Sequence, residues 1–195
     1  MSDATEAAVP TGPVRLVILG RQGSGKGTQC ALLVDHYAIP HISTGDMLRE
    51  AVAEGTEFGL QAKAIMDRGD LVSDEIIVGV VEERLAKDDA AGGYLLDGFP
   101  RTVGQAEALA GIAAPRVVVN LDVPTELVLE RMLLRGRADD TTEAIERRLE
   151  LYEEQTAPLV AYYDDHDILV TVDGVGEVEE VFARVTKAID AAIAP

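Results

Sequence analysis

The stretch "GRQGSGKGTQ", residues 20–29, decides the fold because it crowds four glycines and one lysine into a single turn. An apolar run at residues 14–19 precedes it, and an apolar-rich segment with a helical pattern follows it. From Gly20 the stretch matches G-x-x-x-x-G-K, a pattern in which backbone N–H groups and a helix N-terminus surround a phosphate. A tight turn without a ligand is the alternative, but such a turn has no need for Lys26. The stretch therefore predicts a phosphate-binding turn with Lys26 reaching the β- and γ-phosphates.

Short β-branched runs alternate with longer helical patterns along the rest of the chain. These runs lie at residues 14–19, 40–42, 94–96, 117–121 and 168–172. Strands this apolar bury both faces, which predicts a three-layer α/β fold with a parallel sheet between helices.

Two helical stretches stand out from this alternation. Residues 43–87 carry roughly three helical patterns with no strand between them, which predicts an inserted helical segment that can move. Residues 124–163 predict a helix, a break at Gly136, and a long second helix whose N-cap signals are Asp139, Asp140, Thr141 and Thr142.

Composition limits the partners of the chain. With 195 residues it can build one domain with a sizeable core. A net charge of −18 repels nucleic acid and anionic membranes, so we expect neither as a partner, and an anionic ligand needs a local basic cluster. The single cysteine, Cys30, fits a reducing cytoplasm and leaves no cysteine cluster for a structural zinc. Residues 1–13 predict a disordered tail without signal-peptide features, and residues 14–195 a single domain.

Four sequence blocks, taken together and in order, resemble the adenylate kinase family. They are the turn with its G-K-G-T ending, "HISTGDMLRE" at 41–50, "YLLDGFPRTVGQAE" at 94–107 and "RGRADD" at 135–140. The resemblance covers residues 14 to about 189, and Gln22 stands where the family has a proline that stiffens the turn.

The resemblance implies both a fold and a reaction. The fold is that of a P-loop NTPase, with a central five-stranded parallel sheet, a nucleoside-monophosphate-binding insertion at about 43–72 and a short lid at about 135–140. The reaction is the reversible, Mg²⁺-dependent transfer of the γ-phosphoryl group of ATP to AMP, which gives two ADP. The family also implies a cytoplasmic monomer.

Arginines supply the local positive charge that two facing polyanions require. Taken alone, Arg49 or Arg101 is a surface residue or an ion-pair partner of a carboxylate. Within the blocks, the resemblance gives catalytic roles to Lys26, Arg101, Arg135, Arg137 and Arg148. It assigns ATP binding to Gly23, Ser24, Gly25, Lys26, Gly27, Thr28, Arg131, Arg135 and Gly176.

The remaining assignments concern AMP and the metal. AMP binding is assigned to Thr44, Arg49, Met66, Asp70, Leu71, Val72, Gly98, Phe99, Pro100, Arg101, Gln105, Arg137 and Arg148. Asp97, at the end of a buried strand, is the candidate that organises Mg²⁺ through water, and Asp46 is a weaker one. His36, His41 and His166 are interpreted as structural.

Thr44 and Gln105 bear on the choice of base. A glutamine amide can pair with the N6/N1 edge of adenine, so AMP is favoured over UMP or CMP. Two alternatives remain open at this point: a UMP/CMP kinase, and a regulatory module that binds nucleotides without turnover. Retention of Lys26 and the arginines argues against the second.

Overall fold

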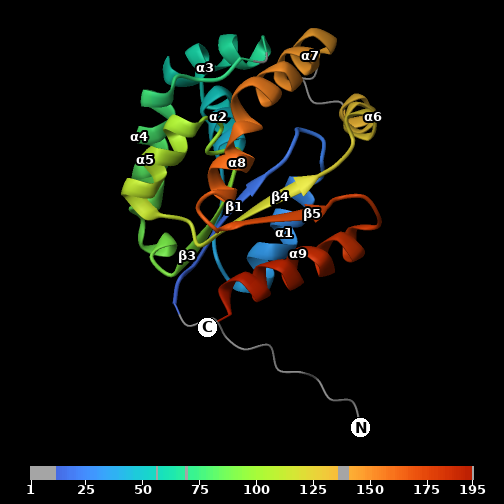
Figure 1. The fold of residues 1–195 in the computed structure, drawn as a ribbon. Coiled ribbons are helices and arrows are strands. Elements are labelled where there is room, and N and C mark those ends of the chain that lie inside the picture. The colour runs from blue at the N-terminus through green and yellow to red at the C-terminus, as the bar shows by residue number, and fades with distance from the viewer. Residues whose placement is uncertain (1–11, 56, 69, 136–140, 195) are drawn as a thin grey trace.

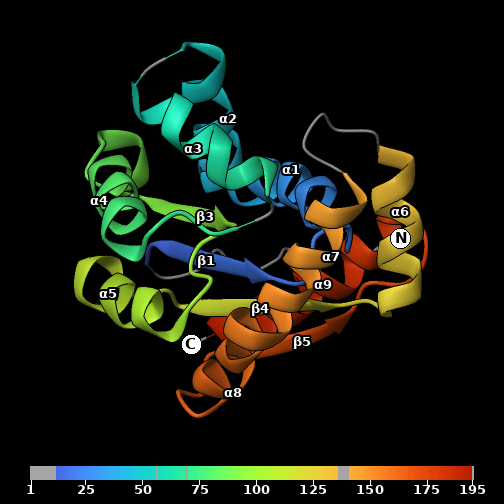
Figure 2. The same ribbon diagram turned by 90° about the horizontal axis from the view of Figure 1, so that it is seen from above.

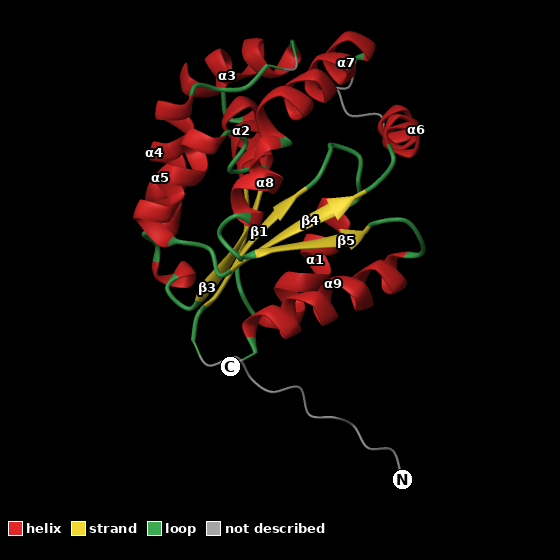
Figure 3. Ribbon diagram, in the orientation of Figure 1, coloured by secondary structure: helices red, strands yellow, loops and turns green. Residues whose placement is uncertain are grey.

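The computed structural model describes residues 12–55, 57–68, 70–135 and 141–194, and for residues 57–59, 61, 66 and 135 it describes the backbone alone. Figures 1 and 3 show its helices and strands. In chain order they are β1 (Val14–Leu19), α1 (Lys26–Tyr37), β2 (His41–Ser43), α2 (Thr44–Ala53), α3 (Glu57–Asp67), α4 (Asp74–Leu85), a 3-10 turn (Asp88–Ala90), β3 (Gly93–Asp97), α5 (Val103–Ala113), β4 (Val117–Asp122), α6 (Thr125–Arg135), α7 (Thr142–Leu151), a π-helix (Tyr152–Thr156), α8 (Pro158–Asp164), β5 (Leu169–Asp173) and α9 (Val178–Ile193).

The five strands form one parallel sheet in the order β2-β3-β1-β4-β5. All five predicted strands are present, with ends that differ from the prediction by at most one residue. Because β1 is central, its Val17 lies opposite Leu96 of β3 and Val118 of β4. The turn at residues 20–25 therefore leaves the middle of the sheet at its carboxyl edge, where open α/β sheets bind ligands.

Alternate residues of the strands build two separate cores. Val17 and Leu19 of β1 pack in the cluster that includes residues of α4, α5 and α8. Leu16 and Ile18 pack with residues of α1 and α9 on the opposite face. Figure 1 shows α1 and α9 on one side of the strands and α5 on the other. This arrangement confirms the three-layer α/β prediction, because each strand is covered on both faces.

The strand-free segment contains the three expected helices, α2, α3 and α4. Ser43 caps α2 by accepting a hydrogen bond from the Asp46 N–H at 3.3 Å. Helices α2 and α3 pack on each other, whereas α4 packs on α5 beside the sheet. Figure 2 shows α2 and α3 on one side of the molecule and α6 on another.

The predicted long helix after Gly136 is wrong in detail, because it consists of α7, a π-helix and α8. Thr141, one of the predicted N-cap residues, caps α7 by accepting a hydrogen bond from the Ala144 N–H at 3.2 Å. The π-helix ends at Thr156, whose hydroxyl donates to the Arg101 carbonyl at 2.9 Å. The end of the π-helix is thus linked by a hydrogen bond to the loop after β3.

Parts of two predictions lie outside the described residues: the tail at residues 1–11 and the turn at 136–140. Among the described residues, no helix combines the length and the apolar character needed to cross a membrane.

Candidate active site

Three glycines of the turn after β1 adopt backbone conformations that other residues rarely reach. Gly20, Gly23 and Gly25 have φ values of 145°, 89° and 98°. A Cβ at Gly23 would lie 2.7 Å from Met132 Cγ and 2.8 Å from the Val128 carbonyl oxygen. Gly25 is the N-cap of α1 and has no side chain that could occupy the first N–H groups of this helix. The helix end is therefore suited to an anion.

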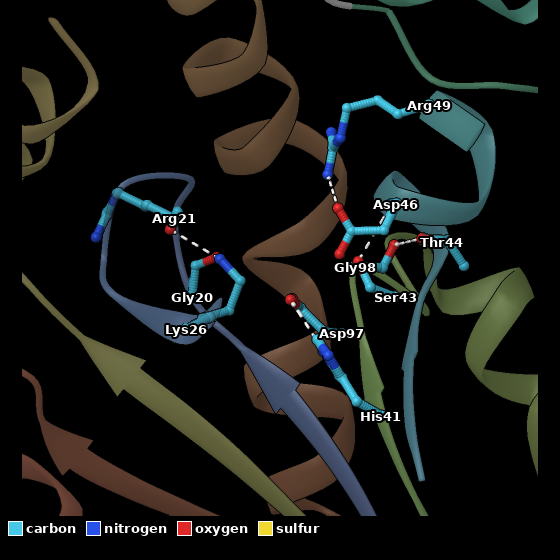
Figure 4. A network of polar contacts seen from close by, with 10 residues as sticks. All are labelled: Gly20, Arg21, Lys26, His41, Ser43, Thr44, Asp46, Arg49, Asp97 and Gly98. Carbon is cyan, nitrogen blue, oxygen red and sulfur yellow. Dashed lines mark hydrogen bonds and ion pairs between the residues drawn. The ribbon is translucent and has the colours of Figure 1, made fainter. Parts of the chain in front are cut away.

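Lys26 begins α1 and folds back over the turn. Its Nζ donates to the carbonyl oxygens of Gly20 at 2.7 Å and Arg21 at 2.9 Å. Figure 4 shows the lysine beside these two carbonyls. The positive charge is thus held at the glycine-rich turn.

A cavity of about 740 Å³ extends from this turn to the ends of β2 and β3. Many of the predicted site residues line it together, although they come from separate blocks of the sequence. These are Gly23, Gly25, Lys26, Gly27, Thr28, Arg49, Leu71, Asp97, Gly98, Pro100, Arg101, Arg131 and Arg148.

A second cavity of about 60 Å³ adjoins the first. Its predicted members are Thr44, Asp70, Leu71, Val72, Gly98, Arg101, Gln105 and Arg148. Arg101 and Arg148 line both cavities. Two compartments therefore meet at a pair of guanidinium groups.

Several predicted residues lie elsewhere. The Ser24 side chain is buried, and its carbonyl oxygen accepts from the Arg131 guanidinium at 3.1 Å. Phe99 is a core residue at 1% exposure. Gly176 lines neither cavity; a Cβ there would meet Arg184 and Glu180 at 2.9 Å. Arg137 and the side chains of Met66 and Arg135 lie outside the described part of the chain.

The guanidinium of Arg101 is influenced by burial and by three charged neighbours. Burial lowers the pKa of its guanidinium, the carboxylate of Asp97 opposes this shift, and the charges of Arg148 and Arg49 add to it. Its Nε donates to the Gly98 carbonyl at 2.8 Å. Arg101 thus carries a buried positive charge near two further guanidinium groups, and a bound anion would offset their mutual repulsion.

Asp97 ends β3 on the cavity wall. Burial raises the pKa of its carboxyl, but the neighbouring His41 together with the charges of Lys26 and Arg101 outweighs burial and holds that pKa below its usual range. Its Oδ2 lies 3.6 Å from His41 Nε2 (Figure 4). The carboxylate therefore stays ionised beside the lysine of the turn.

The two base-selecting residues are buried and already held in place. Thr44 donates to the Gly98 carbonyl at 2.9 Å (Figure 4). The Gln105 amide accepts from the Arg101 N–H at 2.7 Å and donates to Asp74 Oδ1 at 2.6 Å. Asp74 also accepts from the Thr102 hydroxyl at 3.0 Å. The amide orientation of Gln105 is therefore fixed before a base arrives.

Two charged residues of the site are paired with neighbours in this structure. Arg49 forms an ion pair with Asp46, one turn before it in α2 (Figure 4). Asp70 accepts from Arg147 at 3.0 Å and Arg68 at 3.1 Å. Arg147 is 41% exposed and links α7 to the segment before α4. Hydrogen bonds from Arg147 and Arg68 lower the pKa of Asp70.

Sequence reasoning missed several residues of the cavity walls. Leu48 and Ile77 line the small cavity, and His41, Tyr152 and Thr156 line the large one. His41 precedes the Ser-Thr-Gly-Asp block on a strand that pairs with β3. Its place beside this block could have indicated that it lies on the cavity wall. The π-helix that presents Tyr152 and Thr156 has no comparable signal in the sequence.

Comparison with known proteins agrees with this geometry. The sequence profile of the family described as adenylate kinase matches residues 18–168. The chain belongs to the adenylate kinase family. It is 52% identical over 187 residues to the adenylate kinase of Stenotrophomonas maltophilia strain K279a, covering 91% of this chain and 100% of that protein. It is 50% identical over 181 residues to that of Mycobacteroides abscessus (90% and 99%) and 51% identical over 179 residues to adenylate kinase 1 of Synechocystis (89% and 96%).

Membership in the adenylate kinase family fixes the reaction class of the chain. The enzyme transfers a phosphoryl group reversibly between ATP and AMP, which gives two ADP and balances the nucleotide pool. Adenylate kinases use Mg²⁺ with ATP.

Proposed function

We propose that the large cavity binds ATP at the glycine-rich turn, that the small cavity binds AMP, and that the phosphoryl group crosses between them at Arg101 and Arg148. The observation that carries this proposal is that these two arginines line both cavities. A group transferred between two ligands must pass the boundary of their sites, and the guanidinium groups of Arg101 and Arg148 lie at that boundary.

The donor site is made of backbone and one lysine. The N–H groups of residues 23–28 hold the phosphates of ATP, and Lys26 exchanges the carbonyls of Gly20 and Arg21 for phosphate oxygens. Arg131, anchored on Ser24, lies toward the donor nucleotide. Gly176, Arg135 and Arg137 keep their predicted roles on the resemblance alone.

The acceptor site is made of side chains. Arg101, at the boundary of the two cavities, and Arg49, on the adjoining wall of the large cavity, hold the α-phosphate of AMP, for which Arg49 exchanges Asp46 for the ligand. Thr44 and Gln105 face the adenine edge, and Leu71 and Val72 form an apolar wall for the ring. Asp74 is the residue that positions the Gln105 amide. Phe99 supports the wall from the core rather than contacting AMP, and Met66 remains a candidate from sequence.

The chemistry needs alignment and charge rather than a protein nucleophile. A monophosphate has a second pKa near 6 and is mostly dianionic at neutral pH, so it attacks without a general base. Lys26, Arg101 and Arg148 hold the donor and acceptor phosphates in line and stabilise the charge that develops during transfer. Exclusion of water protects ATP from hydrolysis, which we assign to closure of residues 43–72 and of the turn near 135–140 over the cavity.

Asp97 is the residue that we assign to magnesium. Its ionised carboxylate and the Thr28 hydroxyl, both on the wall of the large cavity, match the oxygen ligands that Mg²⁺ prefers. Asp97 would hold the ion through water, and the ion would neutralise charge on the phosphates of ATP. We also assign the enzyme to the cytoplasm as a monomer, in keeping with its single thiol.

A coupled assay with Mg-ATP and each of AMP, UMP and CMP tests the proposal. We expect rapid ADP formation with AMP and much slower transfer to the pyrimidine monophosphates. Preferred transfer to UMP would overturn the base assignment, and binding without transfer to any acceptor would identify a regulatory module instead.

A further inference from the structure

Behind the phosphate-binding lysine, three side chains with metal-binding atoms come together. The thiol of Cys30, the imidazole of His41 and the carboxylate of Asp97 each offer a ligand atom, and all three atoms lie within 4.8 Å of one another. They come from α1, β2 and β3, so the fold alone brings them together. Catalysis as proposed uses only Asp97 of the three.

The surroundings of the imidazole are unusual. His41 Nε2 is buried, and among the described residues no partner lies within hydrogen-bond distance of it. Its nearest charged neighbour, Asp97 Oδ2, is 3.6 Å away, which is too long for a hydrogen bond. Buried polar atoms are normally satisfied, so this nitrogen is suited to a ligand.

The mixture of ligand atoms selects a class of metal. Thiolate and imidazole suit Zn²⁺ and other thiophilic ions, whereas Mg²⁺ demands oxygen ligands and retains water. A tetrahedral zinc ion with bonds of about 2.0–2.3 Å spaces its ligand atoms about 3.3–3.8 Å apart. The three ligand atoms, all within 4.8 Å of one another, lie close to that spacing. A thiolate and a carboxylate also balance the two positive charges of the ion.

Access to the cluster is through the nucleotide cavity. His41 and Asp97 line the large cavity, while Cys30 is fully buried behind them. Cys30 follows Lys26 by four residues, so both lie on the same face of α1. Burial raises the pKa of the Cys30 thiol, so the metal must displace a proton on binding.

We propose that Cys30, His41 and Asp97 form an inhibitory site for Zn²⁺ or a similar thiophilic cation, with its fourth position open to the nucleotide cavity. Occupation withdraws Asp97 from magnesium and places a cation beside Lys26. The inhibitory consequence rests on the proposed role of Asp97 in phosphoryl transfer, whereas metal binding itself does not.

Calorimetric titration of the nucleotide-free, chelator-treated protein with Zn²⁺ alone tests the binding. We expect one Zn²⁺ site in the wild type and an affinity at least about tenfold weaker in Cys30→Ala. The control is His166→Ala, which removes an exposed histidine in the turn after α8 and should keep the wild-type affinity. Equal affinity of the wild type and Cys30→Ala would overturn the site. Co²⁺ provides a second readout, because its thiolate charge-transfer absorption appears only if the Cys30 sulfur is a ligand; a spectrum without that band would also overturn it.

Activity assays then test inhibition separately. With saturating Mg-ATP and AMP, Zn²⁺ should abolish turnover of the wild type at concentrations that leave Cys30→Ala active, and a chelator should restore the wild type. Inhibition of both proteins to the same extent would reject the inhibitory role. If the chain bound Zn²⁺ through Cys30 but transferred no phosphoryl group to AMP, the proposed function would fail and the metal site would stand.

Discussion

The two ends of the active-site cavity are built from different parts of the chain. The donor end is a contiguous turn in which glycines at 20, 23 and 25 and the start of α1 present backbone groups. The acceptor end draws side chains from separate elements, with Thr44, Arg101 and Gln105 held by hydrogen bonds to other residues. Backbone amides recognise phosphate and are indifferent to a distant base. Discrimination between bases must therefore come from the side-chain end.

Loss of the lysine should produce the largest effect and tests the donor end. We expect Lys26→Ala to lower kcat by about 100- to 1000-fold, because it removes a preorganised cation from the transferring phosphate. Its two hydrogen bonds to the turn contribute only about 1 kcal/mol each to folding. Steady-state kinetics and thermal unfolding measure the two effects, with Lys187→Ala, on the exposed face of α9, as the matched control. Unchanged kcat would remove Lys26 from the mechanism.

Replacement of one acceptor arginine by lysine should have the next largest effect. Lysine keeps the charge of Arg101 but loses the planar fork that binds a phosphate with two hydrogen bonds. We expect Arg101→Lys to lower kcat/KM for AMP by about 10- to 100-fold, with a smaller change in KM for ATP. Arg116→Lys is the control, since Arg116 lines neither cavity and donates to the Ile193 carbonyl. An equal proportional change in KM for AMP and in KM for ATP would mean that the donor and acceptor ends of the cavity do not act separately.

A methyl group in the turn tests whether the donor end depends on backbone shape. In Gly23→Ala the new Cβ would approach Met132 and the Val128 carbonyl, at a φ of 89°. We expect a loss of about 1–3 kcal/mol in the free energy of unfolding and a higher KM for ATP. Gly111→Ala, where a Cβ meets no atom within 4 Å, should instead be neutral or stabilising. Denaturant titration of both variants measures this, and equal stability would contradict the role of the turn.

The smallest effect concerns the ion pair that links α7 to the acceptor segment. Because Arg147 and Arg68 lower the pKa of Asp70, its carboxylate stabilises the folded state above the unfolded-state pKa of about 3.9, and this contribution is lost as the pH falls through the lower folded-state value. We expect Asp70→Asn to lower Tm by roughly 1–3 °C at pH 7, and by progressively less as the pH falls through the folded-state pKa of Asp70. High salt should also remove the difference. A Tm difference that persisted at low pH would mean that packing, rather than the ion pair, causes the difference.

The same contrast explains how much the sequence could predict. The donor end is local, so its strand, turn and helix follow from residues 14–37 alone. The parallel sheet and the three inserted helices also follow from patterns of apolar residues. The order of the strands and the meeting of Arg101 with Arg148 depend on long-range packing, and only the family resemblance anticipated that the arginines converge.

Some features could not be predicted because they depend on exact side-chain placement. The pairing of Gln105 with Asp74 joins residues 31 positions apart. His41 was interpreted as structural because the three histidines are scattered along the sequence. The π-helix at Tyr152–Thr156 interrupts a sequence pattern typical of a continuous helix, and its last residue, Thr156, donates a hydrogen bond to the Arg101 carbonyl.

One ratio tests most directly whether phosphate and base are recognised at opposite ends of the cavity. It is kcat/KM for AMP divided by kcat/KM for UMP, measured in the wild type, Lys26→Ala and Gln105→Ala. A ratio is independent of the fraction of active enzyme, so partial unfolding of a variant does not disturb it. We predict that Lys26→Ala slows both acceptors equally and leaves the ratio unchanged, while Gln105→Ala lowers it at least about tenfold. A ratio that falls in Lys26→Ala, or stays constant in Gln105→Ala, would contradict the claim that phosphate and base are read at opposite ends of the cavity.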